Sequence, residues 1–270
     1  MTSTTQPQSS ALSSVGLREI GAGEPVVLIH GVGMQSAAWG PQMDALAETH
    51  RVLALDMPGH GDSAPLPLAS ELPDYVAWLY DTLTTLDLGQ VNIAGHSMGA
   101  LIAGGFAATH PDLTRRVALL NGVFHRTPQA RSAVEARAAE IKAGKIDLET
   151  PLTRWFGDIE ADQLAREKVA GWLGAVDQMG YATAYAAFAR GDATYAGKFA
   201  DIRCPFLAVT ADGDPNSTPA MAEAMAEAVQ DGQAVTIKGH RHMVNLTAPD
   251  LVTSHLLAWL NRAPNQKGVT

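Results

Sequence analysis

A pentapeptide at residues 95–99, GHSMG, has the residue types and spacing of a nucleophilic serine on a sharp turn. It follows a short apolar run and leads directly into small residues that are typical of a buried helix. A strand-to-helix turn of this kind exposes the serine hydroxyl and strains the serine backbone, so residues two positions away must be small. Gly95 and Gly99 fulfil this condition. We therefore predict that Ser97 is a nucleophile at the beginning of a helix.

A serine nucleophile needs a general base, and two histidines follow the last predicted strand. In sheets that carry such a turn, the partners come after the serine in the order acid, then histidine. The segment GHRHMVNLTAPDLV places His240 and His242 in a loop before the final helical segment. We expect His242 to be the base, with His240 as the alternative. The H-x-H spacing alone does not indicate a metal, because no third clustered ligand is evident.

The acid that orients the histidine is expected in the loop after the apolar run FLAVT. This loop reads ADGDPNSTP and offers two aspartates, Asp212 and Asp214. Asp214 begins the turn that leads into the next helical segment, so we prefer it. Asp212 lies nearer the end of the strand and is the alternative.

Two backbone N–H groups must stabilise the negative charge that forms on an attacked carbonyl oxygen. One is expected from Met98, the residue after the serine. The other is expected from the loop HGVGM after the first apolar run, where glycines let the backbone curl around an anion. We choose Val32 for this second donor, with Gly33 as the alternative.

Six short apolar runs predict the strands that position these groups. The runs span residues 26–29, 51–55, 91–94, 117–120, 206–210 and 234–237. Continuous apolar runs of this length suit strands buried on both faces, and helical segments separate most of them. We therefore predict an α/β protein with a mostly parallel sheet, helices on both faces and ligand-binding residues at the carboxyl ends of the strands.

No convincing strand pattern occurs between residues 123 and 201, where the sequence is helical in character. We predict that this segment is a helical cap inserted over the strand ends. The domain prediction is therefore a disordered polar tail (residues 1–14), a core (15–122 and 202–264) and a cap (123–201).

Composition restricts the functions that this chain can have. It has 270 residues with a formal net charge of −9, and 46% of them are hydrophobic, which is enough for a sizeable core. An acidic chain lacks the basic surface that binds nucleic acid. One cysteine, Cys204, excludes a disulfide within the chain and a cluster of thiolate ligands. The N-terminus lacks the pattern of a secretory signal and no membrane span is predicted, so we expect a cytoplasmic protein.

Four motifs in this order resemble those of the α/β-hydrolase superfamily over residues 26–260: HGVGM, DMPGHGDS, GHSMG, and the pair DPNSTP and GHRH. The chain is similar to the serine branch that contains 3-oxoadipate enol-lactonases, small carboxylesterases and carbon–carbon bond hydrolases of aromatic breakdown. The resemblance implies an eight-stranded, mostly parallel sheet with a cap after the sixth strand. It also implies Ser97 as nucleophile, Asp214 as acid and His242 as base. The sequence departs from the family at ADGD, where G-E-x-D is frequent, so the acid has two candidates.

The expected function is a serine hydrolase that cleaves a small carboxylic ester or lactone through an acyl-enzyme, without metal or cofactor. Its expected partner is a small molecule, with no nucleic acid and no membrane; the oligomeric state is left open. A carbon–carbon bond hydrolase is one alternative, although that group typically has Trp where Met243 follows the base. A receptor that keeps the triad and turns over slowly is the other.

The substrate pocket is expected to be lined by bulky side chains of the cap and by the residue after the base. The candidates are Phe124, Trp155, Tyr185 and Met243. A substrate carboxylate would need a cation, and four arginines of the predicted cap are candidates. These are Arg126, Arg131, Arg154 and Arg190.

Overall fold

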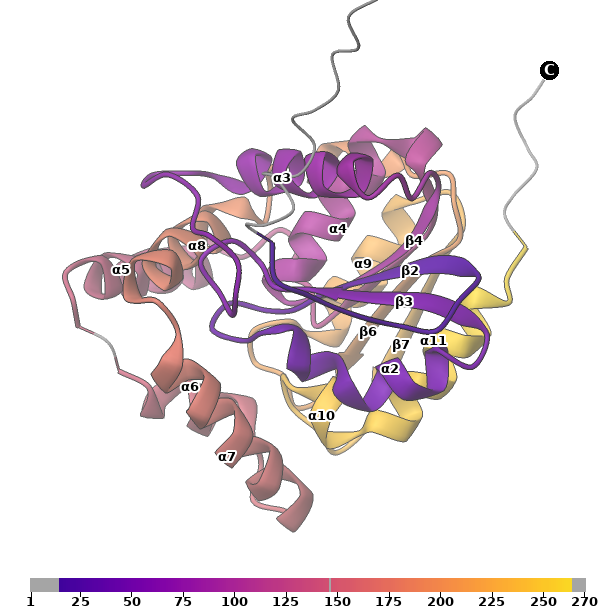
Figure 1. Ribbon diagram of the computed structural model, residues 1–270. Helices are drawn as coiled ribbons and strands as arrows, with labels where there is room; N and C mark the ends of the chain where they lie inside the picture. The colour runs from indigo at the N-terminus through magenta and orange to yellow at the C-terminus, as the bar shows by residue number, and fades with distance from the viewer. Residues whose placement is uncertain (1–14, 146, 264–270) are drawn as a thin grey trace, which may run out of the picture.

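The computed structural model describes residues 15–145 and 147–263 and contains one seven-stranded sheet (Figure 1). The strands are β1 (Leu17–Ile20), β2 (Glu24–Ile29), β3 (His50–Leu55), β4 (Val91–His96), β5 (Thr114–Leu120), β6 (Phe206–Ala211) and β7 (Gly232–Ile237). Their order in the sheet is β1-β3-β2-β4-β5-β6-β7. Strand β1 is antiparallel to β3, and all other neighbours are parallel. The carboxyl ends of β2 to β7 therefore lie at one edge of the sheet.

The predicted fold class is confirmed, but the number of strands differs from the expectation. Each of the six apolar runs lies within one of the strands β2 to β7. The described residues form seven strands rather than the eight that the resemblance implied. The pattern missed β1 because three of its four residues are exposed at the sheet edge, so it carries no continuous apolar run. The predicted tail, residues 1–14, and residue 264 of the predicted core lie outside the described residues.

Helices cover both faces of the sheet, and each face has its own hydrophobic core. One core is closed by α3 (Leu72–Thr85), α4 (Met98–Thr109) and α9 (Pro219–Ala228), and the other by α2 (Gly40–Leu46) and α11 (Pro249–Leu260). Alternate side chains of one strand enter opposite cores, as Val27 and Ile29 do against Val26 and Leu28. None of the described helices is long and apolar enough to cross a membrane.

In the described residues, four α-helices and then a short 3₁₀ helix (Ala196–Asp201) lie between β5 and β6, all within the predicted insertion. These cap helices are α5 (Pro128–Lys142), α6 (Glu149–Trp155), α7 (Glu160–Ala175) and α8 (Gln178–Gly191). Side-chain caps fix two of their starts, because Thr127 accepts a hydrogen bond from the backbone of Ala130 and Asp177 from that of Gly180. Figure 1 shows α8 next to α3 and α4, α5 on the outer side of α8, and α6 and α7 running towards the lower left.

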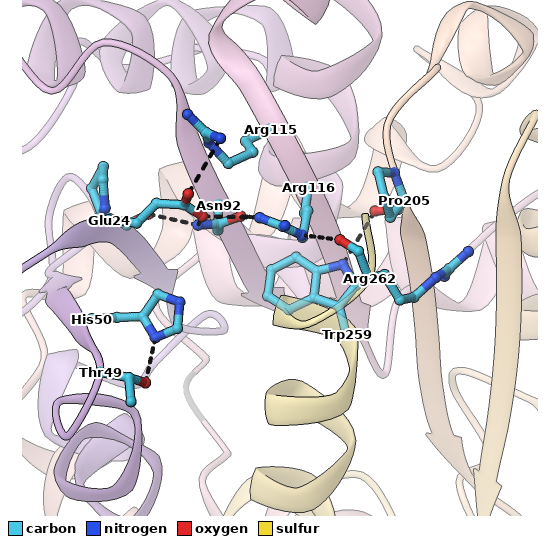
Figure 2. Close-up of polar contacts among 10 residues, drawn as sticks. Glu24, Thr49, His50, Asn92, Arg115, Arg116, Pro205, Trp259 and Arg262 are labelled. Atoms are coloured by element: carbon cyan, nitrogen blue, oxygen red, sulfur yellow. Dashed lines mark hydrogen bonds and ion pairs between the residues drawn. The ribbon is translucent and has the colours of Figure 1, made fainter. Parts of the chain in front are cut away.

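A polar network holds the opposite end of the sheet, where the strands begin (Figure 2). Glu24 on β2 accepts hydrogen bonds from Asn92 on β4 and from Arg116 on β5. Arg116 is 7% exposed and also donates to the side-chain oxygen of Asn92 and to the backbone oxygen of Arg262, after α11. These contacts join three strands and the C-terminal helix. The network therefore fixes the sheet from the end that is remote from the carboxyl edge.

Candidate active site

Ser97 stands on a strained turn between β4 and α4. Its backbone has φ 54° and ψ −112°, a region that side chains rarely adopt. A Cβ on Gly95 would lie 2.0 Å from the carbonyl oxygen of Gly99, and a Cβ on Gly99 would lie 2.2 Å from that of Ile29. The backbone at this turn therefore excludes any side chain at the two flanking positions. The sequence prediction of small residues around Ser97 has this steric cause.

His242 and Asp214 form a buried pair. Nδ1–H of His242 donates to Oδ2 of Asp214 at 2.7 Å, and each residue is 3% exposed. Asp214 follows β6, and His242 lies between β7 and the short helix α10 (Val244–Thr247). The two loops come together because β6 and β7 are parallel neighbours that end at the same edge. This geometry fixes the imidazole tautomer with Nδ1 protonated and Nε2 free to accept a proton.

The two alternative candidates make other contacts. Oδ1 of Asp212 accepts a hydrogen bond from the backbone of Gly239 at 2.8 Å, which joins the loops after β6 and β7. His240 is hydrogen-bonded through Nδ1 to the hydroxyl of Thr247 at 3.0 Å. Both side chains therefore stabilise the loops that carry the buried pair and are not part of it.

Asn121, which the sequence analysis did not single out, supports Asp214. Its Nδ2 donates to Oδ2 of Asp214 at 2.9 Å, and the backbone of Asn216 donates to Oδ1 at 2.8 Å. Burial alone would raise the pKa of Asp214, but the charge of His242 and these hydrogen bonds lower it below its ordinary value. Asp214 is therefore kept ionised beside the imidazole. The sequence feature that could have identified Asn121 is its position directly after an apolar run, at the carboxyl end of a predicted strand.

A buried histidine holds the loop that follows β2. The backbone N–H of Gly33 donates to Nε2 of His60 at 2.9 Å, and Nδ1–H of His60 donates to the carbonyl of Pro58 at 3.1 Å. Burial lowers the pKa of His60 to about 4, so it is neutral near pH 7. The N–H of Gly33 is thereby engaged, which leaves Val32 as the predicted donor of the two that the sequence left open. Val32 lines the same cavity as Ser97.

His96, the residue before the serine, contacts the loop of the buried pair. Its Nε2–H donates to the backbone oxygen of His242 at 2.9 Å. The centres of the two imidazole rings are 5.0 Å apart. Burial lowers the pKa of His96 to about 3, so this ring is neutral and keeps its donor on Nε2. Met98, the other expected backbone donor, is the first residue of α4, where N–H groups have no partner inside the helix.

A cavity of about 430 Å³ opens above the serine, between the sheet and the cap helices. Ser97 and His242 line its floor, and Trp155 and Tyr185 are among its apolar wall residues. The ring of Trp155 stacks on His242 with 5.8 Å between the ring centres. Two of the predicted pocket residues do not belong to the described lining. Phe124 packs against Phe199 in the interior, and Met243 is 1% exposed in the same core.

Three arginines of the cap line this cavity. They are Arg126, Arg137 and Arg154. Nη1 of Arg126 is paired with Asp192, whereas its buried Nη2 has no hydrogen-bond partner among the described residues. Nη2 of Arg154 donates to Oδ1 of Asn216. Arg137 was not among the predicted cations, because the sequence does not show which face of α5 is turned to the cavity.

The other two predicted cap cations lie elsewhere. Nη2 of Arg131 is 2.9 Å from Oδ2 of Asp192, on the outer side of the same carboxylate that holds Arg126. Arg190 pairs with Glu71 across 3.6 Å at an exposed position. Neither residue is part of the described cavity lining.

The parallel sheet, the strained serine turn after its central strand and the inserted helices define an α/β hydrolase. A model of the Alpha/beta hydrolase family matches residues 26–254, and the chain belongs to this family. It is therefore a hydrolase by family, fold and the arrangement at its strand ends.

Two curated relatives and one solved structure are similar over most of the chain. The (E)-2-((N-methylformamido)methylene)succinate hydrolase of Acinetobacter baylyi is 51% identical, over 91% of this chain and 94% of that protein. The 2-(acetamidomethylene)succinate hydrolase of Mesorhizobium japonicum is 27% identical, over 88% of each. The enol-lactonase of Burkholderia xenovorans superposes with a TM-score of 0.83 at 25% identity, over 92% of this chain and 96% of that structure.

Proposed function

We propose that this chain is a serine hydrolase that cleaves the amide of an amidomethylene succinate, a small substrate with two carboxylates. The identity of 51% to a hydrolase named for such a compound supports this substrate class. The second relative, named for the acetamido compound, extends the same support to a neighbouring acyl group. The acyl carbonyl of these compounds is the group that a serine nucleophile attacks.

The group of three arginines in the cavity lining is the observation that carries this proposal. Arg126, Arg137 and Arg154 line the cavity, and the described lining contains no aspartate or glutamate. Arg126 and Arg137 also pair with carboxylates outside the lining, whereas Arg154 donates to the uncharged side chain of Asn216. A guanidinium binds a substrate carboxylate through charge-assisted hydrogen bonds. In a chain of net charge −9, three cations around one cavity favour an anionic ligand.

The chemistry would proceed through an acyl-enzyme on Ser97. Nε2 of His242 takes the proton of the Ser97 hydroxyl as the oxygen attacks the acyl carbonyl, and Asp214 stabilises the resulting imidazolium. The N–H groups of Val32 and Met98 stabilise the oxyanion of the tetrahedral intermediate. The imidazolium then gives its proton to the leaving nitrogen. Water, deprotonated by the same imidazole, releases the acyl group as a carboxylic acid.

A small ester or lactone is the second candidate substrate. The apolar walls of the cavity and the likeness to an enol-lactonase favour it, and the attack on a carbonyl carbon would be the same. This candidate gives the three arginines no role. A slow receptor would show a burst of nitrophenol with little further turnover in the following test. Carbon–carbon bond cleavage would use the same nucleophile on a ketone, and products from the three test substrates that require Ser97 would speak against it.

The test compares charged and neutral forms of one substrate. Wild type and Ser97→Ala are incubated with (E)-2-((N-methylformamido)methylene)succinate, with its dimethyl ester and with p-nitrophenyl acetate, and released formate, acetate and nitrophenol are measured. The proposal predicts formate release from the dicarboxylate that requires Ser97 and exceeds that from the diester. Faster turnover of p-nitrophenyl acetate than of the dicarboxylate would instead support the ester hydrolase.

A further inference from the structure

The loops that carry the candidate acid and base form hydrogen bonds with one helix of the cap, α6. Nη1 of Arg241, the residue directly before the candidate base, donates to the carbonyl oxygens of Thr153 (2.9 Å) and Phe156 (2.6 Å). From α6 itself, Nη2 of Arg154 donates at 2.9 Å to the side-chain oxygen of Asn216, two residues after the candidate acid. The cap and the loops that carry the candidate acid and base are thus joined at the C-terminal end of α6.

The position of α6 depends on such contacts. It has seven residues, and a helix this short is not stable on its own. The last carbonyl groups of a helix have no partner inside it, and a cation at that end interacts favourably with the helix dipole. Arg241 supplies hydrogen-bond donors for these carbonyl groups and a positive charge at this end of α6. Its methylene stem packs beside Gly213 in the loop of the candidate acid. One side chain therefore spans from the triad loops to the end of α6.

Helix α6 carries two residues that face the reaction site. Trp155 stacks on the imidazole of His242, and Arg154 lines the cavity. A movement of the end of α6 would therefore displace both Trp155, which stacks on His242, and Arg154, which lines the cavity. The contact of Arg241 with α6 therefore connects the recognition of the substrate to the environment of the base.

We propose that Arg241 is a positioning residue that latches α6 onto the loop of His242, and that this latch sets the affinity for the anionic substrate. The anionic character of the substrate rests on the proposed function. The latch itself rests on the two hydrogen bonds and on the stacking of Trp155, which are independent of any substrate.

The first experiment measures the latch without a substrate. Hydrogen–deuterium exchange of the α6 amides is compared in wild type, Arg241→Met, which keeps an unbranched stem without donors, and Arg241→Lys, which keeps a cation. We expect exchange in α6 to be about tenfold or more faster in Arg241→Met, with Arg241→Lys intermediate. Equal exchange in wild type and Arg241→Met would overturn the latch.

The second experiment measures its effect on recognition. Arg241→Met should raise KM for the dicarboxylate about 10- to 100-fold, the size expected for losing charge-assisted hydrogen bonds, and change kcat less. The matched control is Arg166→Met, because Arg166 pairs with Glu149 of the same helix but comes from α7. An equal rise of KM in the control would refute a specific role of Arg241. If wild type does not hydrolyse the dicarboxylate, the proposed function fails, and the exchange experiment still decides on the latch.

Discussion

Arg126 offers the sharpest test of substrate recognition, because its two terminal nitrogens have different surroundings. Nη1 is paired with Asp192, and the guanidinium lies over the ring of Phe188 at 4.4 Å. Nη2 is buried and has no partner in the part of the chain that the structure describes. The perturbation is Arg126→Met, which keeps an apolar stem of similar length and removes every donor.

The expected loss follows from these contacts. A hydrogen bond between a guanidinium and a substrate carboxylate contributes about 1.5–3 kcal/mol, which corresponds to a rise in KM of about 10- to 100-fold. The dimethyl ester of the same substrate should show a much smaller rise, because it has no carboxylate to pair. The variant also removes one cation from the buried Asp192, so the free energy of unfolding should fall by up to about 3 kcal/mol.

The assay is steady-state formate release with the dicarboxylate and with its dimethyl ester. Arg131→Met is the matched control, because Arg131 binds the same Asp192 but lies outside the described cavity lining. If the control raises KM as much as Arg126→Met does, the effect comes from the loss of Asp192 pairing. An unchanged KM in Arg126→Met would refute a contact between Arg126 and a substrate carboxylate.

Further predictions concern the acid, the pH dependence and the sheet. Asp214→Asn should lower kcat by about 10⁴-fold, whereas Asp212→Asn should change kcat far less; equal losses would contradict the assignment of Asp214 as the acid. His60 and His96 are neutral when folded, with pKa values of about 4 and about 3, below the ordinary 6.5. The unfolded chain therefore binds more protons below pH 6.5, so the urea midpoint should fall between pH 6.5 and pH 4; a constant midpoint would contradict this. Glu24→Ala leaves the buried arginine of the network in Figure 2 without its carboxylate, and thermal unfolding should show a loss of about 3 kcal/mol in the free energy of unfolding.

The layout of the sheet was predictable where burial makes a pattern. Strands β2 to β6 are mostly buried, and their apolar runs were visible in the sequence. Strand β7 was also predicted, although three of its six residues are exposed. Strand β1 was missed because an exposed edge strand, LREI, reads as an ordinary polar loop.

The site was predictable where local sterics dictate residue types. The glycines around Ser97 are required by backbone contacts within one turn, so a sequence pattern reveals them. The choice of Asp214 over Asp212 depends on which carboxylate the loops turn towards His242, which a position in a turn can only suggest.

The contributions of the cap could not be predicted in the same way. Arg137 and Arg190 look equivalent in the sequence, and each pairs with an exposed glutamate, yet Arg137 lines the cavity and Arg190 is not part of its described lining. Phe124 looks like a pocket residue but packs against Phe199 in the core. Helical faces are set by packing between segments that are distant in the chain, and the weak amphipathicity of α5 gives little indication of its inner face.

The most direct measurement of the central claim is formate release from (E)-2-((N-methylformamido)methylene)succinate by wild type and Ser97→Ala under identical conditions. We predict turnover by wild type and a loss of about 10⁵- to 10⁶-fold in the variant, because Ser97 forms the acyl-enzyme. Retention of more than about a tenth of the activity in Ser97→Ala would contradict a serine nucleophile at this site.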